Sequence, residues 1–207
     1  MKTFLLPGFL VPGLALLLLV GCSSEPSKPA VPAVKPPEYV AGRTAFQKMY
    51  VASRGWNRDA QGFVLSSALT KDSNGHDGKS GVWQARFASP SKSTAKPYTW
   101  CGSNDADVDR GVTPGSEDSY SATNTSTHVF DIAFLKSDSD EAYATALKHG
   151  GQKLLDQNAD QHVMYLLQWS APDNSLVWHV IFGDSHNDFK LSVLVNASSG
   201  EYMRMEK

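Results

Sequence analysis

Alternating aspartates in a polar segment are the sharpest chemical feature of this sequence. Asp105, Asp107 and Asp109 stand two residues apart, and Glu117 follows within the same segment. Carboxylates at this spacing on a loop can bring hard oxygen ligands onto one Ca²⁺ ion. The EF-hand pattern, however, requires glycine directly after the third acid, and Arg110 occupies that position. A calcium site and a solvated acidic linker both stay open, and the linker is the simpler interpretation.

A second polar loop carries donor atoms that suit a metal ion. Asp72, Asn74, His76 and Asp77 lie close together in the sequence. The same stretch contains an Asn-Gly and an Asp-Gly pair, which are strong turn signals because glycine adopts positive φ without strain. The sequence therefore favours a turn over a metal site here.

Six histidines are spread along the chain, and no two of them have the His-x-His or HExxH spacing of a zinc site. His179 and His186, together with Asp184 and Asp188, could converge at a hairpin turn as a transition-metal site. Surface and helix-end histidines explain the same residues more simply.

Cys101 is the one cysteine outside the N-terminal region, and two interpretations apply to it. It can be a reactive thiol, or a buried thiol that behaves as a small hydrophobic residue at a strand end; the second is favoured because no Cys–His pattern accompanies it. The sequence has no GxSxG or SxxK motif and no glycine-rich phosphate loop. We therefore expect a protein that is not an enzyme and has no cofactor.

The N-terminus directs the chain out of the cytoplasm. Met1 and Lys2 precede an apolar run that ends in Leu19-Val20-Gly21-Cys22. This segment resembles a bacterial lipoprotein signal peptide with its lipobox, which implies removal of residues 1–21 and acylation of Cys22, with palmitate among the acyl chains. An ordinary secretory signal is the alternative. Ser23 and Ser24 come next instead of aspartate, so the resemblance implies the outer membrane, with the protein facing the periplasm.

After the signal peptide, the composition predicts two parts, which are a proline-rich spacer and a globular domain region. Residues 22–41 are proline-rich and predict a semi-rigid spacer after the lipidated cysteine. The 207-residue chain is 41% hydrophobic and 19% charged, which is typical of a globular protein. Its net charge of −2 argues against nucleic-acid binding, which requires a basic excess.

A short sequence motif occurs twice in the chain. Val82-Trp83 and Val177-Trp178 stand in similar apolar runs 95 residues apart, and Gly55 and Gly150, at the ends of two helical stretches, have the same separation. The recurrence predicts two copies of one unit, over residues 42–125 and 126–207. The apolar stripes of the two helical stretches align slightly better at a shift of 97 residues, so the equivalence of the two units is approximate.

Each predicted unit is a helix followed by antiparallel strands. Phe46, Met49 and Tyr50 form the apolar stripe of the first helix, and acidic residues at 137–141 predict the start of the second. Residues 129–135 are expected to form a strand. The runs at 176–182 and 189–195 predict a hairpin, in which His179 is the one polar residue on its face. One amphipathic helix can cover the apolar face of each meander.

The last strands carry a family resemblance. The segments Trp178-His-Val-Ile-Phe-Gly183 and Lys190-Leu-Ser-Val-Leu-Val-Asn-Ala-Ser-Ser-Gly-Glu201 resemble the closing strands of PepSY-like domains. Asn196 and Ser199 depart from the aspartate and threonine usual there. The resemblance implies an α+β fold of two tandem PepSY-like, cystatin-like units, each a helix packed on an antiparallel meander. It carries over no site residue.

These patterns together predict a lipid-anchored cell-envelope module that binds a protein or peptide partner and is not catalytic. The resemblance implies that it inhibits a peptidase or acts as a sensor. The alternative is a calcium-dependent envelope protein, or an unrecognised hydrolase, that uses Cys101 or the loop at residues 105–109. The partner, and whether the two units share one sheet, stay open.

Overall fold

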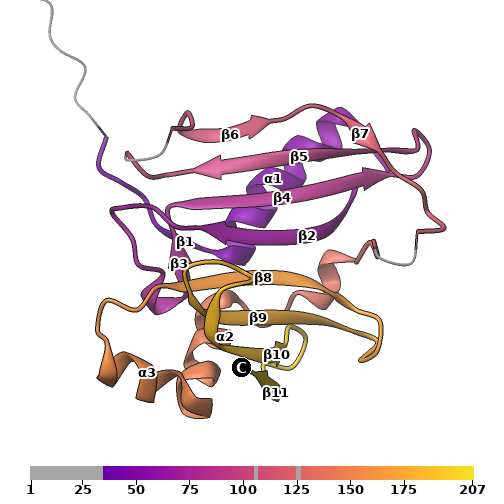
Figure 1. Cartoon of the computed structure of the whole chain (residues 1–207). Coiled ribbons are helices and arrows are strands. Elements are labelled where there is room, and N and C mark those ends of the chain that lie inside the picture. The colour runs from indigo at the N-terminus through magenta and orange to yellow at the C-terminus, as the bar shows by residue number, and fades with distance from the viewer. Residues whose placement is uncertain (1–34, 105–106, 125–126) are drawn as a thin grey trace, which may run out of the picture. The chain divides into compact units, whose positions relative to one another are not determined.

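The computed structural model describes residues 35–104, 107–124 and 127–207. Its first half contains a 15-residue helix and strands that follow it, and its second half repeats that order (Figure 1). The elements are β1 (Val40–Ala41), α1 (Gly42–Trp56), β2 (Gln61–Ala68), β3 (Lys79–Ser80), β4 (Val82–Ser89), β5 (Thr94–Cys101), β6 (Gly111–Pro114), β7 (Asp118–Ser119), α2 (Ser139–Ala146), α3 (Gln152–Gln157), β8 (Val163–Ser170), β9 (Ser175–Gly183), β10 (Phe189–Asn196) and β11 (Tyr202–Glu206). Among these residues, no helix is long and apolar enough to cross a membrane.

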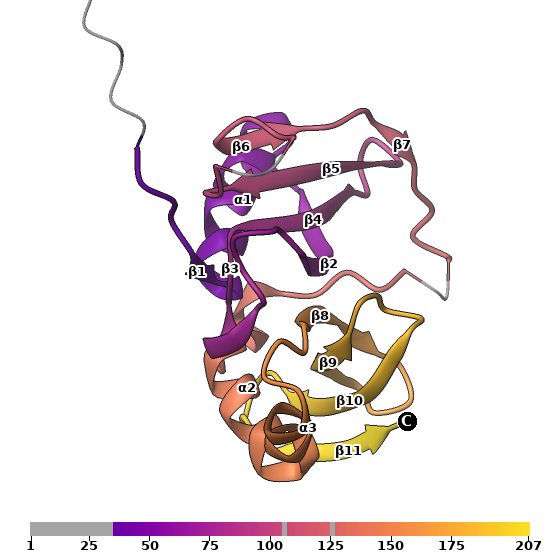
Figure 2. The same cartoon turned by 60° about the vertical axis from the view of Figure 1, so that its left-hand side comes forward.

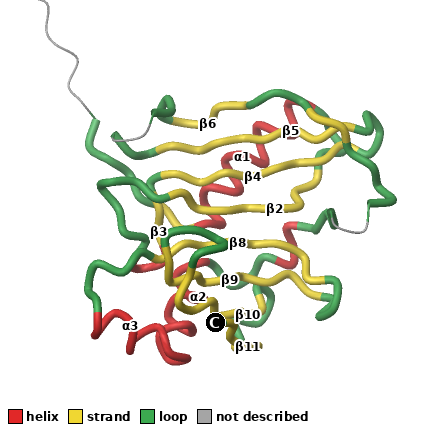
Figure 3. Tube along the Cα trace, viewed as in Figure 1, coloured by secondary structure: helices red, strands yellow, loops and turns green. Residues whose placement is uncertain are grey.

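One antiparallel sheet of nine strands runs through the described residues. Its order is β11-β10-β9-β8-β2-β4-β5-β6, and β7 also pairs with β5 (Figure 3). The two meanders join where β2 pairs with β8, with Leu65 opposite Leu167. The expected α+β class with antiparallel strands is therefore confirmed, and the halves form one sheet and not two.

Both helices lie on the same face of this sheet. Helix α1 contacts β2, β4 and β5, and α2 contacts β9 and β10. Figure 2 shows the two helices on one side and the strands on the other. The helix-covered face holds the largest buried side chains, among them Trp83, Trp178, Tyr165, Phe46 and Phe87. Within the part of the chain that the structure describes, no helix lies on the opposite face of the sheet.

The repeated tryptophans occupy matching places in the two halves. Trp83 on β4 donates its indole N–H to the carbonyl of Val40 at 2.9 Å, and Trp178 on β9 donates to the carbonyl of Ser137 at 3.0 Å. Each carbonyl lies two residues before the first residue of the following helix, Gly42 or Ser139. The two rings meet edge to face at 6.3 Å.

The N-termini of the two helices meet, and one pair of side chains caps both. The carboxylate of Asp138 accepts the N–H of Ser139 at 2.7 Å and the N–H of Arg43 at 2.8 Å. The hydroxyl of Ser139 accepts the N–H of Gly42 at 2.7 Å and donates to the carbonyl of Gly78 at 2.6 Å. Helix α1 has no side-chain cap from its own N-cap residue, Ala41. Residues of the second half therefore satisfy the first N–H groups of α1.

Two local expectations have different outcomes. The strand expected at residues 129–135 is wrong: Phe130 forms a single bridge with Gly62, and Ile132–Phe134 is a 3₁₀ helix. The side chain of Asp131 accepts the N–H of Ala133 at 2.9 Å, which favours a helical turn over an extended chain. The expected helix start at residues 137–141 is confirmed, with a complete capping box between Asp138 and Glu141.

Candidate functional site

A single row of side chains crosses the helix-free face of the sheet from one edge to the other. Cross-strand pairing places eight residues directly beside one another, one from each successive strand. Because alternate residues of a strand point to opposite faces, the row faces away from the buried Trp83 and Ala85. We call this surface the open face. Its central row is Thr113, Thr99, Gln84, Ser66, Leu166, His179, Leu194 and Arg204.

The open face is polar and accessible over the first half of the chain. Gln84 and Arg86 are exposed on β4, beside the half-buried Thr99 and Ser66. The Arg86 guanidinium lies 5.6 Å from the centre of the Phe63 ring. A surface of this kind offers hydrogen-bonding groups and an aromatic side chain together.

The second half of the open face is more enclosed and centres on His179. The side chain of Gln168 lies 3.5 Å from the ring of His179. Arg204 on β11 reaches Asp173, in the turn between β8 and β9, with two contacts of 2.8 and 2.9 Å. The pKa of Asp173 lies below its ordinary value because of hydrogen bonds from Ser170 and Arg204. This pair holds an edge strand to a turn two strands away.

Burial sets the titration of the two histidines on this side of the molecule. Burial lowers the pKa of His179 below its ordinary value, and the charge of Glu206 opposes that effect, while Arg204 and His186 add to it. Burial likewise lowers the pKa of His186. The Nδ1 atom of His186 is buried and has no hydrogen-bond partner among the described residues.

A loss of stability on mild acidification follows from these histidines. Below the ordinary histidine pKa of about 6.5, the unfolded chain binds protons that the folded chain does not. The contribution of the neutral histidines to the free energy of unfolding is therefore fully present above that pH and decreases as the pH drops. His179→Gln is expected to reduce the difference in the free energy of unfolding between pH 7.5 and pH 5.5, measured by urea denaturation. His128→Gln, at an exposed histidine outside the sheet, is the control. An unchanged difference in His179→Gln would contradict the assignment.

The structure does not assemble the zinc site considered for the hairpin. Asp184 contacts His162 at 2.6 Å instead of joining His179. Among residues 35–104, 107–124 and 127–207, no group of three or more His, Cys, Asp or Glu side chains is placed to hold a metal ion.

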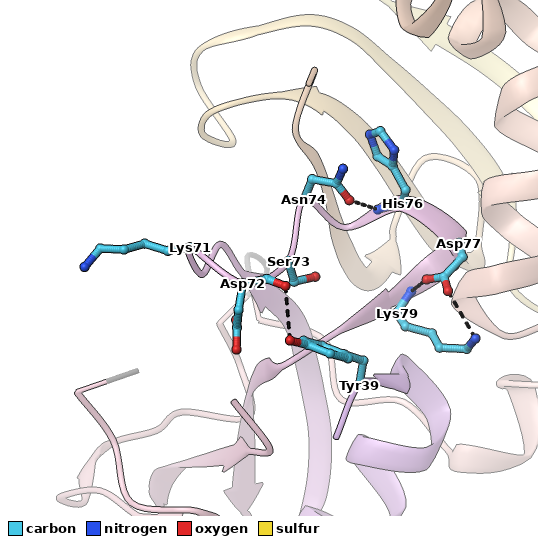
Figure 4. A pocket seen from close by; sticks show the side chains of 8 residues that line it. All are labelled: Tyr39, Lys71, Asp72, Ser73, Asn74, His76, Asp77 and Lys79. Atoms are coloured by element: carbon cyan, nitrogen blue, oxygen red, sulfur yellow. Dashed lines mark hydrogen bonds and ion pairs between the residues drawn. The ribbon is translucent and has the colours of Figure 1, made fainter. Parts of the chain in front are cut away.

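The polar loop at residues 71–79 encloses a hollow of about 490 Å³ (Figure 4). The acidic side chains of the loop already have protein partners. Asp72 accepts hydrogen bonds from Thr70 and Ser103, and Asp77 contacts Lys79 at 3.2 Å. Burial raises the pKa of Asp72, but these hydrogen bonds outweigh it and the net shift is downward. Figure 4 shows Asp72 and Asp77 on different sides of the loop.

Positive φ values support the turn interpretation of this loop. Gly75 has φ of 76° and Gly78 has φ of 79°. His76 contacts the carbonyl of Gln161 at 2.8 Å, and the side chain of Asn74 accepts the N–H of His76 at 3.1 Å. The donors named for a metal are therefore committed to the turn and to its contact with the second half.

None of the remaining sequence candidates that the structure describes is a member of the open-face row. Cys22 and Asp105 fall outside the described residues. Asp107 and Asp109 are exposed in the segment before β6. Cys101 is buried and donates its thiol to the carbonyl of Ser103 at 3.5 Å, as expected for a thiol packed at a strand end.

Comparison with known proteins supplies one structural relative. No family model matches the chain, and no curated protein sequence is significantly similar to it. The fold is similar to the crystal structure of a candidate lipoprotein from Clostridium difficile 630, with a TM-score of 0.50 and 10% sequence identity. The match covers 80% of this chain and 93% of that one. At this identity the likeness concerns the fold.

Proposed function

We propose that this chain is a lipid-anchored protein of the cell envelope that binds a protein or peptide partner through the open face and catalyses no reaction. The observation that supports binding is the unbroken cross-strand row from Thr113 to Arg204 on a face that neither α1 nor α2 covers. Nearly all large apolar side chains among the described residues are buried, including Leu194 and its neighbours in the second half of this face. The accessible part is therefore the polar half around Gln84 and Arg86, which the fold leaves for recognition.

The size of the open face suits a macromolecular partner. Strands lie about 4.8 Å apart, so a row across eight strands spans about 34 Å. With three rows of side chains along the strands, the whole face measures roughly 600–700 Å². Leu194, Val177 and Ile181 are buried, so the accessible half on β6, β5, β4 and β2 measures roughly 300 Å². A standard protein interface uses about 800 Å² on each partner, so the accessible half suits a peptide or a small protein contact. A small metabolite would leave most of such a surface empty.

The resemblance of the closing strands to PepSY-like domains supports the same function. The repeated helix-and-meander order gives each half the layout expected of such a unit. We propose that the two halves are PepSY-like units, and that the partner is a peptidase or a sensory component of the envelope. The similarity in fold to a candidate lipoprotein supports the lipid anchor and the envelope location.

Photo-crosslinking in cells tests the binding surface. A photoreactive amino acid at Gln84, exposed on the open face, is expected to give a discrete crosslinked product that contains a second protein. The matched control is Gln47, which is exposed on α1 on the opposite side of the sheet. Arg86→Glu is expected to weaken the product from Gln84. Equal products from both positions, or none from Gln84, would refute the assignment of the open face.

Fractionation tests the anchor independently. The protein with its natural sequence is expected to be acylated and to sediment with the membranes. Cys22→Ser is expected to release the protein from the membranes or to block its maturation. Mass spectrometry of the mature N-terminus checks for an acylated cysteine. A mature protein that begins at another residue and stays soluble would exclude lipid anchoring without affecting the crosslinking result.

A further inference from the structure

A basic hollow lies at the junction of α3, the end of α2 and the last two strands. It has a volume of about 450 Å³. Among the described residues, its lining contains four lysines and one histidine and no aspartate or glutamate: Lys148, His149, Lys153, Lys190 and Lys207. The whole chain carries a net charge of −2, so this concentration of positive charge is local. None of the four lysines forms an ion pair with a described residue.

An irregular helical segment builds one wall of the hollow. Residues Leu147–Gly151 join α2 to α3 across a kink, in which His149 (φ −111°) and Gly150 (φ 108°) depart from helical geometry. The kink places the ring of His149 parallel to the ring of Tyr202 on β11, with the ring centres 3.8 Å apart and an angle of 6° between the planes.

The remaining wall of the hollow is apolar. Leu154 is half-buried, Leu191 is buried, and Met205 is 48% exposed, an unusually high value for a large hydrophobic side chain in this protein. The hollow therefore pairs cationic side chains with apolar ones. Asp160, Asp184 and Asp188 line a second hollow that shares Lys190 with this one, so an anion is repelled there and attracted to the basic hollow.

We infer that this basic hollow binds the headgroup of an anionic phospholipid. The lysines contact the phosphate, while Leu154 and Met205 contact the glycerol and the first acyl carbons. The choice of a lipid over a free anion depends on the exposed apolar wall and on the lipid anchor proposed above, which keeps the body beside a membrane surface. Each lysine near an anionic surface adds about 1 kcal/mol of attraction, or about fivefold in affinity.

Titration with soluble short-chain lipids tests the hollow directly. The mature chain, residues 22–207 carrying Cys22→Ser, is titrated with dihexanoyl phosphatidylglycerol, dihexanoyl phosphatidylcholine and inorganic phosphate, and is followed by NMR. Phosphatidylglycerol is expected to shift the resonances of His149, Lys153 and Lys190 most strongly. Lys148→Gln combined with Lys153→Gln is expected to weaken this binding about 25-fold. The control is Lys92→Gln combined with Lys136→Gln, two exposed lysines elsewhere on the surface.

Three results would overturn the inference. An absence of shifts would show that the hollow binds no lipid. Equal affinity for phosphatidylcholine would assign the binding to the apolar wall alone. Equal affinity for inorganic phosphate would reduce the hollow to a site for an adventitious ion only. None of these results bears on the anchor or on the open face, because the titration uses a chain without the acylated cysteine and probes the helix side of the sheet.

Discussion

Asp138→Ala is expected to lower the free energy of unfolding by about 2–4 kcal/mol, because one carboxylate caps two helices. Loss of an N-cap side chain costs about 1 kcal/mol and up to about 2 kcal/mol. Here the change removes the acceptor for Ser139 of α2 and also for Arg43 of α1. Asp138 is 8% exposed, so water cannot easily replace the lost acceptor. Urea denaturation followed by circular dichroism measures the loss.

Two further variants separate capping from charge. Asp138→Asn keeps a side-chain oxygen acceptor and is expected to lose clearly less stability than Asp138→Ala. Asp140→Ala removes an exposed acid from the first turn of α2 and is expected to cost about 0.3–1 kcal/mol through the helix dipole. If Asp138→Ala costs no more than Asp140→Ala, the shared cap is not a determinant of stability.

Gly42→Ala is expected to destabilise the fold by about 1–3 kcal/mol, although alanine has the higher helix propensity. A Cβ atom at this position would lie 2.6 Å from the ring of Trp178 and 3.1 Å from the ring of Trp83. Both rings are fully buried and both indole N–H groups are bound, so neither can move without breaking other contacts. The cost of overpacking therefore exceeds the gain in propensity.

The same helix provides the matched control. Gly55 has no atom within 4 Å of an added Cβ, so Gly55→Ala is expected to leave stability unchanged or to raise it by up to about 1 kcal/mol. Thermal or urea unfolding of the two variants should give shifts of opposite sign. Equal shifts would mean that the contact between α1 and the two tryptophans is looser than the geometry indicates.

Local signals explain the predictions that the structure confirms. The α+β class followed from helical stripes and alternating strands, whose periods the sequence displays directly. The start of α2 followed from Asp138 and Glu141, three residues apart, because a capping box is complete within one turn. The repeated tryptophan motif indicated equivalent positions, and each indole binds the carbonyl before its own helix. The helical and strand periods and the capping box depend on neighbours a few residues away, whereas the tryptophans were recognisable because the same short motif recurs.

A local signal also led to the error at residues 129–135. The apolar alternation there is real, and Phe130 and Leu135 are buried. No strand forms because the side chain of Asp131 accepts the N–H of Ala133 and favours a helical turn. In addition, the N–H groups of Lys136 and Ser137 bind the distant carbonyl of Ala197 and turn the chain toward α2. The competing partner comes from another part of the chain, so the alternation could not reveal it.

The open face could be anticipated only in part. The polar residues Gln84 and Arg86 alternate with buried ones within β4, which marks an exposed side of that strand. His179 was also recognisable as the polar member of an apolar face. Its neighbours Arg204 and Asp173 belong to different turns and strands, and no spacing in the sequence relates them.

The sequence by itself determined the class of fold, the two helix-and-meander segments and the positions of the tryptophans, because period and spacing are local properties of a chain. Only the tertiary structure decided that β2 pairs with β8 in one sheet, that Asp138 caps a helix of the other half, and that eight residues form one row. These arrangements depend on contacts between residues up to about one hundred positions apart, which are selected by packing of the whole core and leave no pattern in any short segment.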